Sequence, residues 1–404
     1  MKRLADELPH RDAAFLLEAA PRRLARLKAR RKLWLEVHLW LGLVAGAALV
    51  LIGLTGSVLV FWQEIDTALN PALRRVESTA VPQPLPLATL AEAAQAGLPP
   101  GTQPNWIEFP RFQQEALSLS YAVPSPSVPG QTDSRNLFIN PYTGQVQGAR
   151  LWYPADYFAG MPLMAFMFKL HYALLIKNGG VPLVGIIAVL LLFSVLTGLI
   201  VWWPLTGQWR QALTLKRRAS IERRNFDLHK TAGVYTMPVM LAVLLSGVSM
   251  NLPDEFNRVV EWFSPLNLSE CFHSGPPNGR SAISWASAAD IANAAYPEGR
   301  LAWLSAPADA VGVYQICKAD IAALSRFVGN RCLLVDQYSG AVLKVIDAAS
   351  GTAGDVFLQW QWPLHSGQAF GWPGRILVFL TGLACPLMFV TGFVRWRQKR
   401  RARV

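Results

Sequence analysis

Charged residues are scarce in this chain, and long apolar stretches take their place. Only 16% of its 404 residues are Asp, Glu, Lys or Arg, whereas 52% are hydrophobic. This composition is too apolar for an ordinary soluble enzyme. Four apolar stretches are long enough to cross a bilayer, so the sequence predicts an α-helical integral membrane protein with four transmembrane helices.

Several common functional motifs are also missing. No GxSxG, Walker, HExxH or GxGxxG sequence stands where it would have the right structural context. The chain has no zinc finger and no RNA-binding aromatic motif, so no nucleic acid is expected among its partners. The basic net charge of +12 therefore needs another explanation.

The basic residues mark the ends of the apolar stretches. They crowd the N-terminus, the short middle loop and the C-terminus. By the positive-inside rule these parts are cytoplasmic, and the two long connecting segments are translocated, into the periplasm of a bacterial inner membrane. The N-terminal segment is no cleavable signal peptide. It is expected either to lie as a helix on the anionic inner leaflet or to be a solvated tail.

The expected order along the chain follows from these patterns. It is a basic cytoplasmic tail (1–32), a first transmembrane helix (33–62), a periplasmic module (63–169), a rim segment with the second transmembrane helix (170–203), a cytoplasmic loop (204–228), a third transmembrane helix (229–252), a second periplasmic module (253–364), a rim segment with the fourth transmembrane helix (365–397) and a cytoplasmic tail (398–404).

Cysteine is rare, with four residues in the chain. Cys385 falls inside the last apolar stretch and is expected to pack there. Cys271, Cys317 and Cys332 fall in the second translocated segment. Three is an odd number, so at most one intrachain disulfide forms among them, and the pairing stays open.

The chain contains an internal duplication, with an offset of 191 to 197 residues. The landmarks that match at identical spacing are His38, Gly42, Thr55 and Gly56 with His229, Gly233, Ser246 and Gly247, and His171, Gly180, Thr197, Gly198 and Trp202 with His365, Gly374, Thr391, Gly392 and Trp396. The segment "LFINPYTGQV" likewise resembles "LLVDQYSGAV", each predicting a hairpin with a structural turn at Gly144 or Gly340. A parallel tandem 2+2 repeat with a pseudo-twofold axis along the membrane normal is expected.

Four of the six histidines belong to this duplication. The axis relates His38 to His229 near the cytoplasmic face, and His171 to His365 near the periplasmic face. Two imidazoles that face each other across a helix bundle suit the axial ligation of a haem, which predicts two haems. A zinc site fits poorly, because two His do not complete a tetrahedral site. The alternative role for each histidine is a helix cap or a lipid-headgroup contact.

Two haems on one axis would form an electron path across the bilayer. A helix of about 20 residues spans roughly 30 Å, which leaves a short gap between two macrocycles. Electrons are expected to enter at His38 and His229 and to leave at His171 and His365. The absence of CxxCH argues against covalently attached haem. The Thr-Gly and Ser-Gly pairs are expected to serve helix packing or to make room for a porphyrin.

These residues resemble the PepSY-associated transmembrane family. The resemblance rests on H-x3-G…TG in the first span, on "FINPYTGQV" and "LVDQYSGAV", on "DLHKTAG" and on "LHSGQAFG", and it covers about residues 33 to 397. It implies two α+β PepSY-like modules and, for the FoxB-type members, a dihaem reductase that releases iron from a periplasmic ferric siderophore. The family's haem ligands then correspond to His38, His171, His229 and His365, with two b-type haems.

Aromatic residues ahead of His171 and His365 are candidates for contact with the siderophore. They are Trp152, Tyr153, Phe158, Trp360 and Trp362. Their alternative role is an interfacial aromatic belt. Arg150 and Lys169 are candidates for contact with a haem propionate or an anionic substrate.

Other functions stay open at the level of sequence. A siderophore permease would need no haem, and four spans without an inverted repeat argue against transport. A sensing or binding protein would need no paired histidines. A dihaem protein with another electron acceptor, such as copper or a periplasmic protein, would keep the haems and the paired histidines. The electron donor, either cytoplasmic or the quinol pool, is also open.

Overall fold

The computed structural model describes residues 10–77, 83–205, 207–267, 272–321, 331–347 and 351–401, with side chains from residue 29 onward. The chain forms two compact units. The first contains Met1–Leu54, Ile186–Leu245 and Leu380–Val404, and the second contains Thr55–Gly185 and Ser246–Phe379. Each unit takes segments from both halves of the duplicated sequence.

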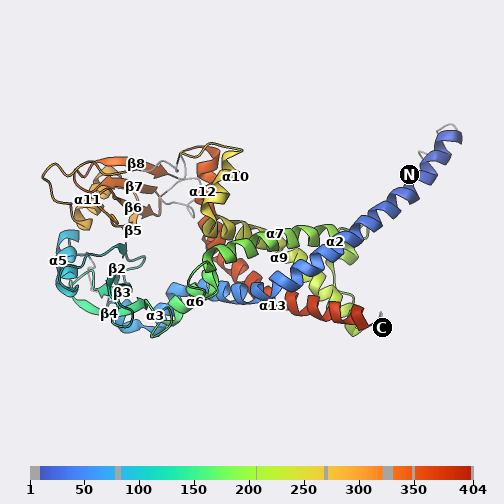
Figure 1. Cartoon of the computed structure of the whole chain (residues 1–404), viewed down its shortest axis with the longest axis horizontal. Helices are drawn as coiled ribbons and strands as arrows, with labels where there is room; N and C mark the ends of the chain where they lie inside the picture. The colour runs from blue at the N-terminus through green and yellow to red at the C-terminus, as the bar shows by residue number, and fades with distance from the viewer. Residues whose placement is uncertain are drawn as a thin grey trace. The chain divides into compact units, whose positions relative to one another are not determined.

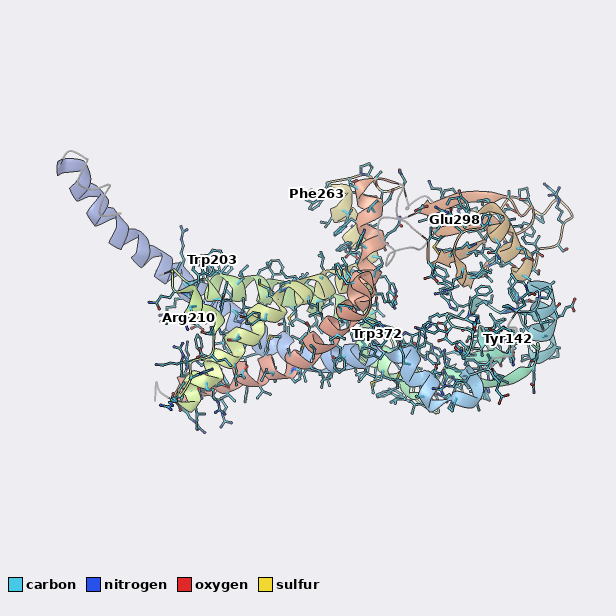
Figure 2. The ribbon with its side chains drawn as sticks, turned by 180° about the vertical axis from the view of Figure 1, so that it is seen from behind. Tyr142, Trp203, Arg210, Phe263, Glu298 and Trp372 are labelled. Carbon is cyan, nitrogen blue, oxygen red and sulfur yellow. A yellow bond between two sulfur atoms is a disulfide. The ribbon has the colours of Figure 1, made fainter. Side chains whose placement is uncertain are left out.

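Among the described residues, four helices are long and apolar enough to cross a membrane. They are α2 (His10–Leu59), α7 (Gly180–Trp202), α9 (Ile221–Asn251) and α13 (Gly371–Arg401). Figure 2 labels Trp203, which follows α7, and Trp372, which lies in the first turn of α13. Tryptophan is enriched at the two interfaces of a bilayer. The expected four membrane helices are therefore present, and the chain is a membrane protein.

The first and third membrane helices begin earlier than expected. Helix α2 begins at His10 and α9 begins at Ile221, whereas boundaries at 33 and 229 were expected. No Gly or Pro stands between Ala29 and His38 or between Ile221 and His229, and the Arg, Lys and Leu residues there are good helix formers. His38 and His229 thus lie inside their helices instead of starting them, and His229 lies about two turns after the start of α9.

The second unit contains one antiparallel sheet in the order β4-β3-β2-β1-β5-β6-β7-β8 (Figure 1). Its strands are β1 (Trp106–Glu108), β2 (Leu117–Pro124), β3 (Thr132–Ile139), β4 (Val146–Tyr153), β5 (Arg300–Ser305), β6 (Val313–Ala319), β7 (Arg331–Asp336) and β8 (Val342–Asp347). Strands β1 and β5 pair at the centre, with Ile107 opposite Leu304. The two modules expected from the sequence therefore share one sheet.

One face of this sheet carries the core. Alternate residues such as Leu119 and Leu137 in β2 and β3, and Ile316 and Leu333 in β6 and β7, are fully buried together. Helices α5 (Leu87–Gly97) and α11 (Trp285–Ala295) pack against this face. The intervening strand residues point to the opposite face, as the period of two requires. That second face carries polar and aromatic side chains.

The duplicated hairpin turns are structural, as the sequence predicts. Asn140 Oδ1 accepts the backbone N–H of Tyr142, and Asp336 Oδ1 accepts that of Tyr338. Gly144 and Gly340 have φ values of +73° and +72°, which favour glycine. Because both modules repeat this turn, the register of the two hairpins is the same.

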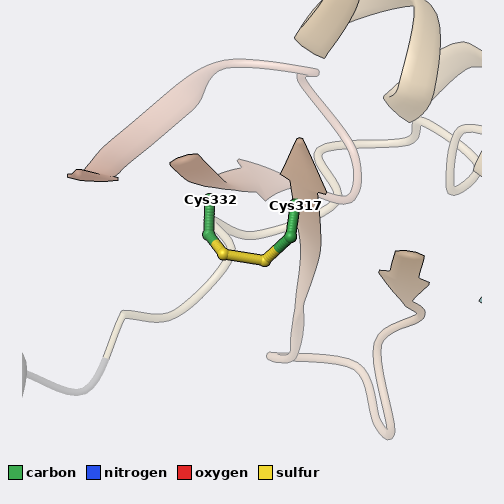
Figure 3. The surroundings of a disulfide bond; sticks show 2 residues. All are labelled: Cys317 and Cys332. Atoms are coloured by element: carbon green, nitrogen blue, oxygen red, sulfur yellow. A yellow bond between two sulfur atoms is a disulfide. The ribbon is translucent and has the colours of Figure 1, made fainter. Parts of the chain in front are cut away.

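A disulfide joins Cys317 in β6 to Cys332 in β7 (Figure 3). The two residues are direct partners across the strands. Cys385 is buried and free, as expected for a packing residue, and Cys271 lies outside the described residues. The remaining elements are α3 (Trp62–Leu69), α4 (Pro71–Arg74), α6 (Leu163–Ala173), α8 (Trp209–Leu213), α10 (Pro253–Glu261), α12 (Ala353–Ser366) and the 3-10 helix η1 (Gln368–Phe370).

Candidate haem sites

His38 of α2 and His229 of α9 face each other inside the first unit. Their ring centres lie 6.2 Å apart and their planes cross at 71°. Both side chains are partly buried. The pair that the duplication predicts is therefore formed in the structure.

The Nδ1 atoms of this pair are held by the neighbouring membrane helices. His38 Nδ1 donates to the Ser194 carbonyl oxygen at 2.8 Å, and His229 Nδ1 donates to that of Met388 at 3.0 Å. The hydroxyl of Thr391 lies 3.0 Å from His229 Nδ1. A proton on Nδ1 leaves Nε2 with its lone pair, the form in which a neutral imidazole binds a metal.

His171 and His365 form the corresponding pair in the second unit. Their ring centres lie 5.9 Å apart, at 68°. His171 is on α6 and His365 is on α12, the short helices ahead of the second and fourth membrane helices. Thr55 Oγ1 lies 3.2 Å from His171 Nδ1, and Ser246 Oγ lies 3.0 Å from His365 Nδ1.

Two duplicated glycines allow these short helices to turn into the membrane helices. A Cβ on Gly180 would lie 2.3 Å from the Ala173 carbonyl oxygen, and one on Gly374 would lie 2.1 Å from that of Gly367. No other residue fits so close to backbone. Because of these two glycines, His171 and His365 lie on short helices that are separate from the membrane helices α7 and α13.

The Thr-Gly and Ser-Gly pairs position the imidazoles. A Cβ on Gly198 would lie 2.9 Å from His38 Cε1, and one on Gly56 would lie 2.9 Å from His171 Cε1. The corresponding distances are 3.2 Å from Gly392 to His229 and 3.6 Å from Gly247 to His365. The nearest atoms are those of the imidazoles, so these glycines make room for the ligand rings themselves, whereas the sequence suggested helix packing or a porphyrin.

The spacing of both pairs fits one iron between two imidazoles. A metal–imidazole bond is about 2 Å, and a ring nitrogen lies about 1.1 Å from its ring centre, so two axial imidazoles place their centres about 6 Å apart. The observed 6.2 Å and 5.9 Å agree with this value. In the described part of the chain, no group of three or more His, Cys, Asp or Glu forms a metal site. In that part of the chain each histidine pair therefore stands without a third ligand of these types.

A known protein family matches almost the whole chain. A family model described as the PepSY-associated TM region matches residues 35–399. The chain belongs to the PepSY-associated transmembrane family. None of the curated proteins matches it in a sequence search. The family match covers all four membrane helices and both modules, and it leaves the substrate of this PepSY-associated protein to be argued from its own residues.

Arg150 lies in an ion-pair cluster. Its Nη1 and Nη2 donate to the two carboxylate oxygens of Asp66 at 2.8 Å and 2.6 Å. Arg74 pairs with the same carboxylate, which is almost fully buried. The Arg150 guanidinium is therefore neutralised by a buried partner instead of standing free for a propionate or an anionic substrate.

Trp152 and Tyr153, from the end of β4, lie near α3 and α6. Trp152 approaches Trp62 with ring centres 6.4 Å apart. Lys169 Nζ lies 4.6 Å from the centre of the Tyr153 ring. Burial, reinforced by Tyr172, raises the pKa of Tyr153 well above its ordinary value, so this phenol stays protonated.

The other substrate candidates do not join this group. Phe158 is 59% exposed and Trp362 is 50% exposed, while Trp360 packs against Ala369 of η1. Sequence reasoning also overlooked residues that the fold brings to Trp152. Trp62, Asp66 and Arg74 all lie just after the first membrane helix. In the sequence, these three residues form a short polar and aromatic run at the start of the first module, and this run could have indicated them.

Proposed function

We propose that this protein is a dihaem electron-transfer protein of the bacterial inner membrane that reduces a periplasmic ferric siderophore. One observation carries the proposal: two duplicated imidazole pairs have ring centres about 6 Å apart, with each Nδ1 beside a hydrogen-bonding oxygen of a membrane helix. A b-type haem bound between each pair would supply one-electron chemistry. The FoxB-type members of the family provide the substrate class.

The protein's own residues would fix the axial ligands. The carbonyl oxygens of Ser194 and Met388 set the orientation and the proton position of the first pair. The hydroxyls of Thr55 and Ser246 contact the second pair. Such outer partners raise the basicity of an imidazole and tune the potential of the metal.

The proposed reaction is a one-electron reduction. A cytoplasmic reductant or a quinol donates the electron, and the siderophore-bound Fe(III) becomes Fe(II). Hydroxamate and catecholate oxygens are hard ligands that hold Fe(II) much less tightly than Fe(III), so reduction releases the metal. Electrons enter at His38 and His229 and leave at His171 and His365.

Absorption spectra and a pyridine haemochrome assay of the detergent-purified chain test the cofactor. We expect two b-type haems per chain in the wild type and about one in His38→Ala or His171→Ala. His273→Ala is the matched control, because His273 belongs to neither pair and should keep two. A wild-type chain without haem, despite ample haem supply, would contradict the proposal.

The substrate needs a separate measurement. Haem in the purified chain is reduced with dithionite, excess reductant is removed, and a ferric siderophore is added with a ferrous chelator present. Reoxidation of haem with stoichiometric Fe(II) capture is expected. If Cu(II) reoxidises the haem while no ferric siderophore does, the acceptor is different.

A further inference from the structure

A small pocket opens on the face of the sheet that is not covered by α5 and α11. Its volume is about 150 Å³, and its lining includes Trp62, Trp106, Trp152, Arg74, Ser118 and Asn136. Pockets that hold a whole drug-sized ligand usually measure about 300–1,000 Å³. This pocket has room for one arm of a larger molecule.

Two buried polar groups in this lining have capacity to bind a ligand. Asn136 is 6% exposed, and its Oδ1 accepts a hydrogen bond from Ser120 Oγ. Ser118, which is 5% exposed, lines the same pocket. The amide of Asn136 and the hydroxyl of Ser118 are hydrogen-bond donors, so both are suited to an oxygen atom that enters the pocket.

The charges around the pocket balance. Arg74 and Arg150 carry two positive charges, and Asp66 together with Glu108 carries two negative ones. Glu108 is further held by Gln63 Nε2 at 2.8 Å. A strongly anionic group would gain no net attraction here, whereas an uncharged amide or hydroxamate could use the donors and the flat tryptophan rings.

The second module lacks this arrangement, although it repeats the strands. Ser120 pairs with Asn136 across β2 and β3, and Cys317 pairs with Cys332 across β6 and β7 at the corresponding register. The disulfide thus replaces the polar pair of the first module. Gln315 takes the position of Ser118, since Ser118 lies opposite Phe138 and Gln315 opposite Leu334.

The pocket is linked to the second histidine pair by aromatic contacts. The Trp62 ring lies 5.5 Å from that of Phe168 on α6. Phe168 precedes His171 by three residues, so both lie on one side of that helix. A ligand against Trp62 is therefore separated from the α6 histidine by a single aromatic residue.

We infer that this pocket binds an uncharged amide or hydroxamate arm of the electron-accepting substrate. The first module alone provides the site, and the disulfide-bonded second module acts as its structural counterpart. The inference rests on the proposed function for the identity of the acceptor, but the binding of the arm itself requires no haem.

Binding of a redox-silent probe tests the pocket in the full chain. The probe is the neutral gallium(III) complex of a linear trihydroxamate, with the gallium(III) complex of a tricatecholate, which is strongly anionic, as its comparison. Ser118→Leu fills the pocket, and Gln315→Leu makes the same change in the second module. We expect Ser118→Leu to raise the Kd of the hydroxamate probe at least about tenfold, with Gln315→Leu unchanged.

The outcomes separate the pocket from the proposed function. Equal Kd values for wild type and Ser118→Leu, no hydroxamate binding by wild type, or tighter binding of the catecholate probe would each overturn the inference. Haem content serves as the folding check, and Asn136→Ala replaces Ser118→Leu if the latter does not fold. A haem-free chain that still binds the probe through Ser118 would refute the reductase alone, whereas an unchanged KM for the ferric complex in Ser118→Leu would refute the pocket alone.

Discussion

At the scale of single residues, each candidate ligand depends on a dipeptide far away in the sequence. Thr55 and Gly56 contact His171, and Thr197 and Gly198 contact His38. The hydroxyl faces Nδ1 and the missing Cβ makes room for the ring. The same division of roles recurs in the second half of the chain. A methyl group added at the glycine should therefore displace the imidazole, although the histidine itself is unchanged.

Gly198→Ala is expected to lose the haem of the His38 pair. Its new Cβ would lie 2.9 Å from His38 Cε1, so the ring must shift. Gly42→Ala is the control, because no atom lies within 4 Å of its new Cβ. Alanine favours a helix by about 1 kcal/mol over glycine, so helix propensity cannot explain a loss. Haem per chain is the measurement, and two haems in Gly198→Ala would contradict the positioning role.

Asp336 should make the second module sensitive to acid. Burial by itself would raise its pKa, but the N–H donors of Ser339, Gly275 and Tyr338 outweigh burial and lower the pKa to about 2. A lowered pKa stabilises the fold above about pH 4, and this contribution is lost as the pH falls towards 2.

The variant Asp336→Asn tests this contribution. Asparagine can keep the turn, as Asn140 does in the first module, but it loses the charge-assisted bond from Gly275. At pH 7 the variant should melt at a lower temperature than the wild type, and the gap should close between pH 4 and pH 2. A gap of constant size across this range would show that the carboxylate charge is not involved.

At the scale of elements, the two modules use different cross-strand connections at the same register. The first has the hydrogen bond from Ser120 to Asn136, and the second has the disulfide between Cys317 and Cys332. A hydrogen bond holds two formed strands together, whereas a disulfide also restricts the unfolded chain. The second module should therefore depend on oxidation and the first should not.

Removal of the disulfide gives a measurable loss of stability. The cysteines are 15 residues apart, and closing a loop of that length stabilises a fold by about 3 kcal/mol. The double variant Cys317→Ser/Cys332→Ser should expose β6 and β7 to faster amide hydrogen exchange, while β2 and β3 change less. Dithiothreitol should reproduce the effect in the wild type and leave the variant unchanged. Identical exchange in oxidised and reduced wild type would rule out a stabilising role.

At the scale of the whole molecule, both candidate haem sites combine the two halves of the duplicated chain. Each histidine pair takes one residue from each half, and each pair lies inside one compact unit. The shared sheet joins the halves in the same way, through β1 and β5. Neither half alone contains a complete histidine pair.

Double variants test this pairing. His38→Ala/His229→Ala removes both ligands of one site and should keep one haem, because the other pair lies in another unit. His38→Ala/His365→Ala damages both sites and should keep almost none. If the first double variant lost both haems, or the second kept one, the pairs would be assigned incorrectly.

The sequence by itself was enough for the membrane class, the duplication and the pairing partners. Length and hydropathy identify a spanning helix without any tertiary contact. A repeat whose offset stays between 191 and 197 residues implies a symmetry axis that relates His38 to His229. The hairpin turns at Gly144 and Gly340 were predictable as well, because turn chemistry is local.

Only the tertiary structure decided which groups meet through space. The contact of Thr55 with His171 joins residues 116 positions apart, and the choice of Cys332 as the partner of Cys317 depends on strand register. The pairing of β1 with β5 and the pocket beside Asn136 likewise arise from packing between distant segments. Such contacts depend on which distant segments pack together, and a periodic pattern along the chain does not predict that packing.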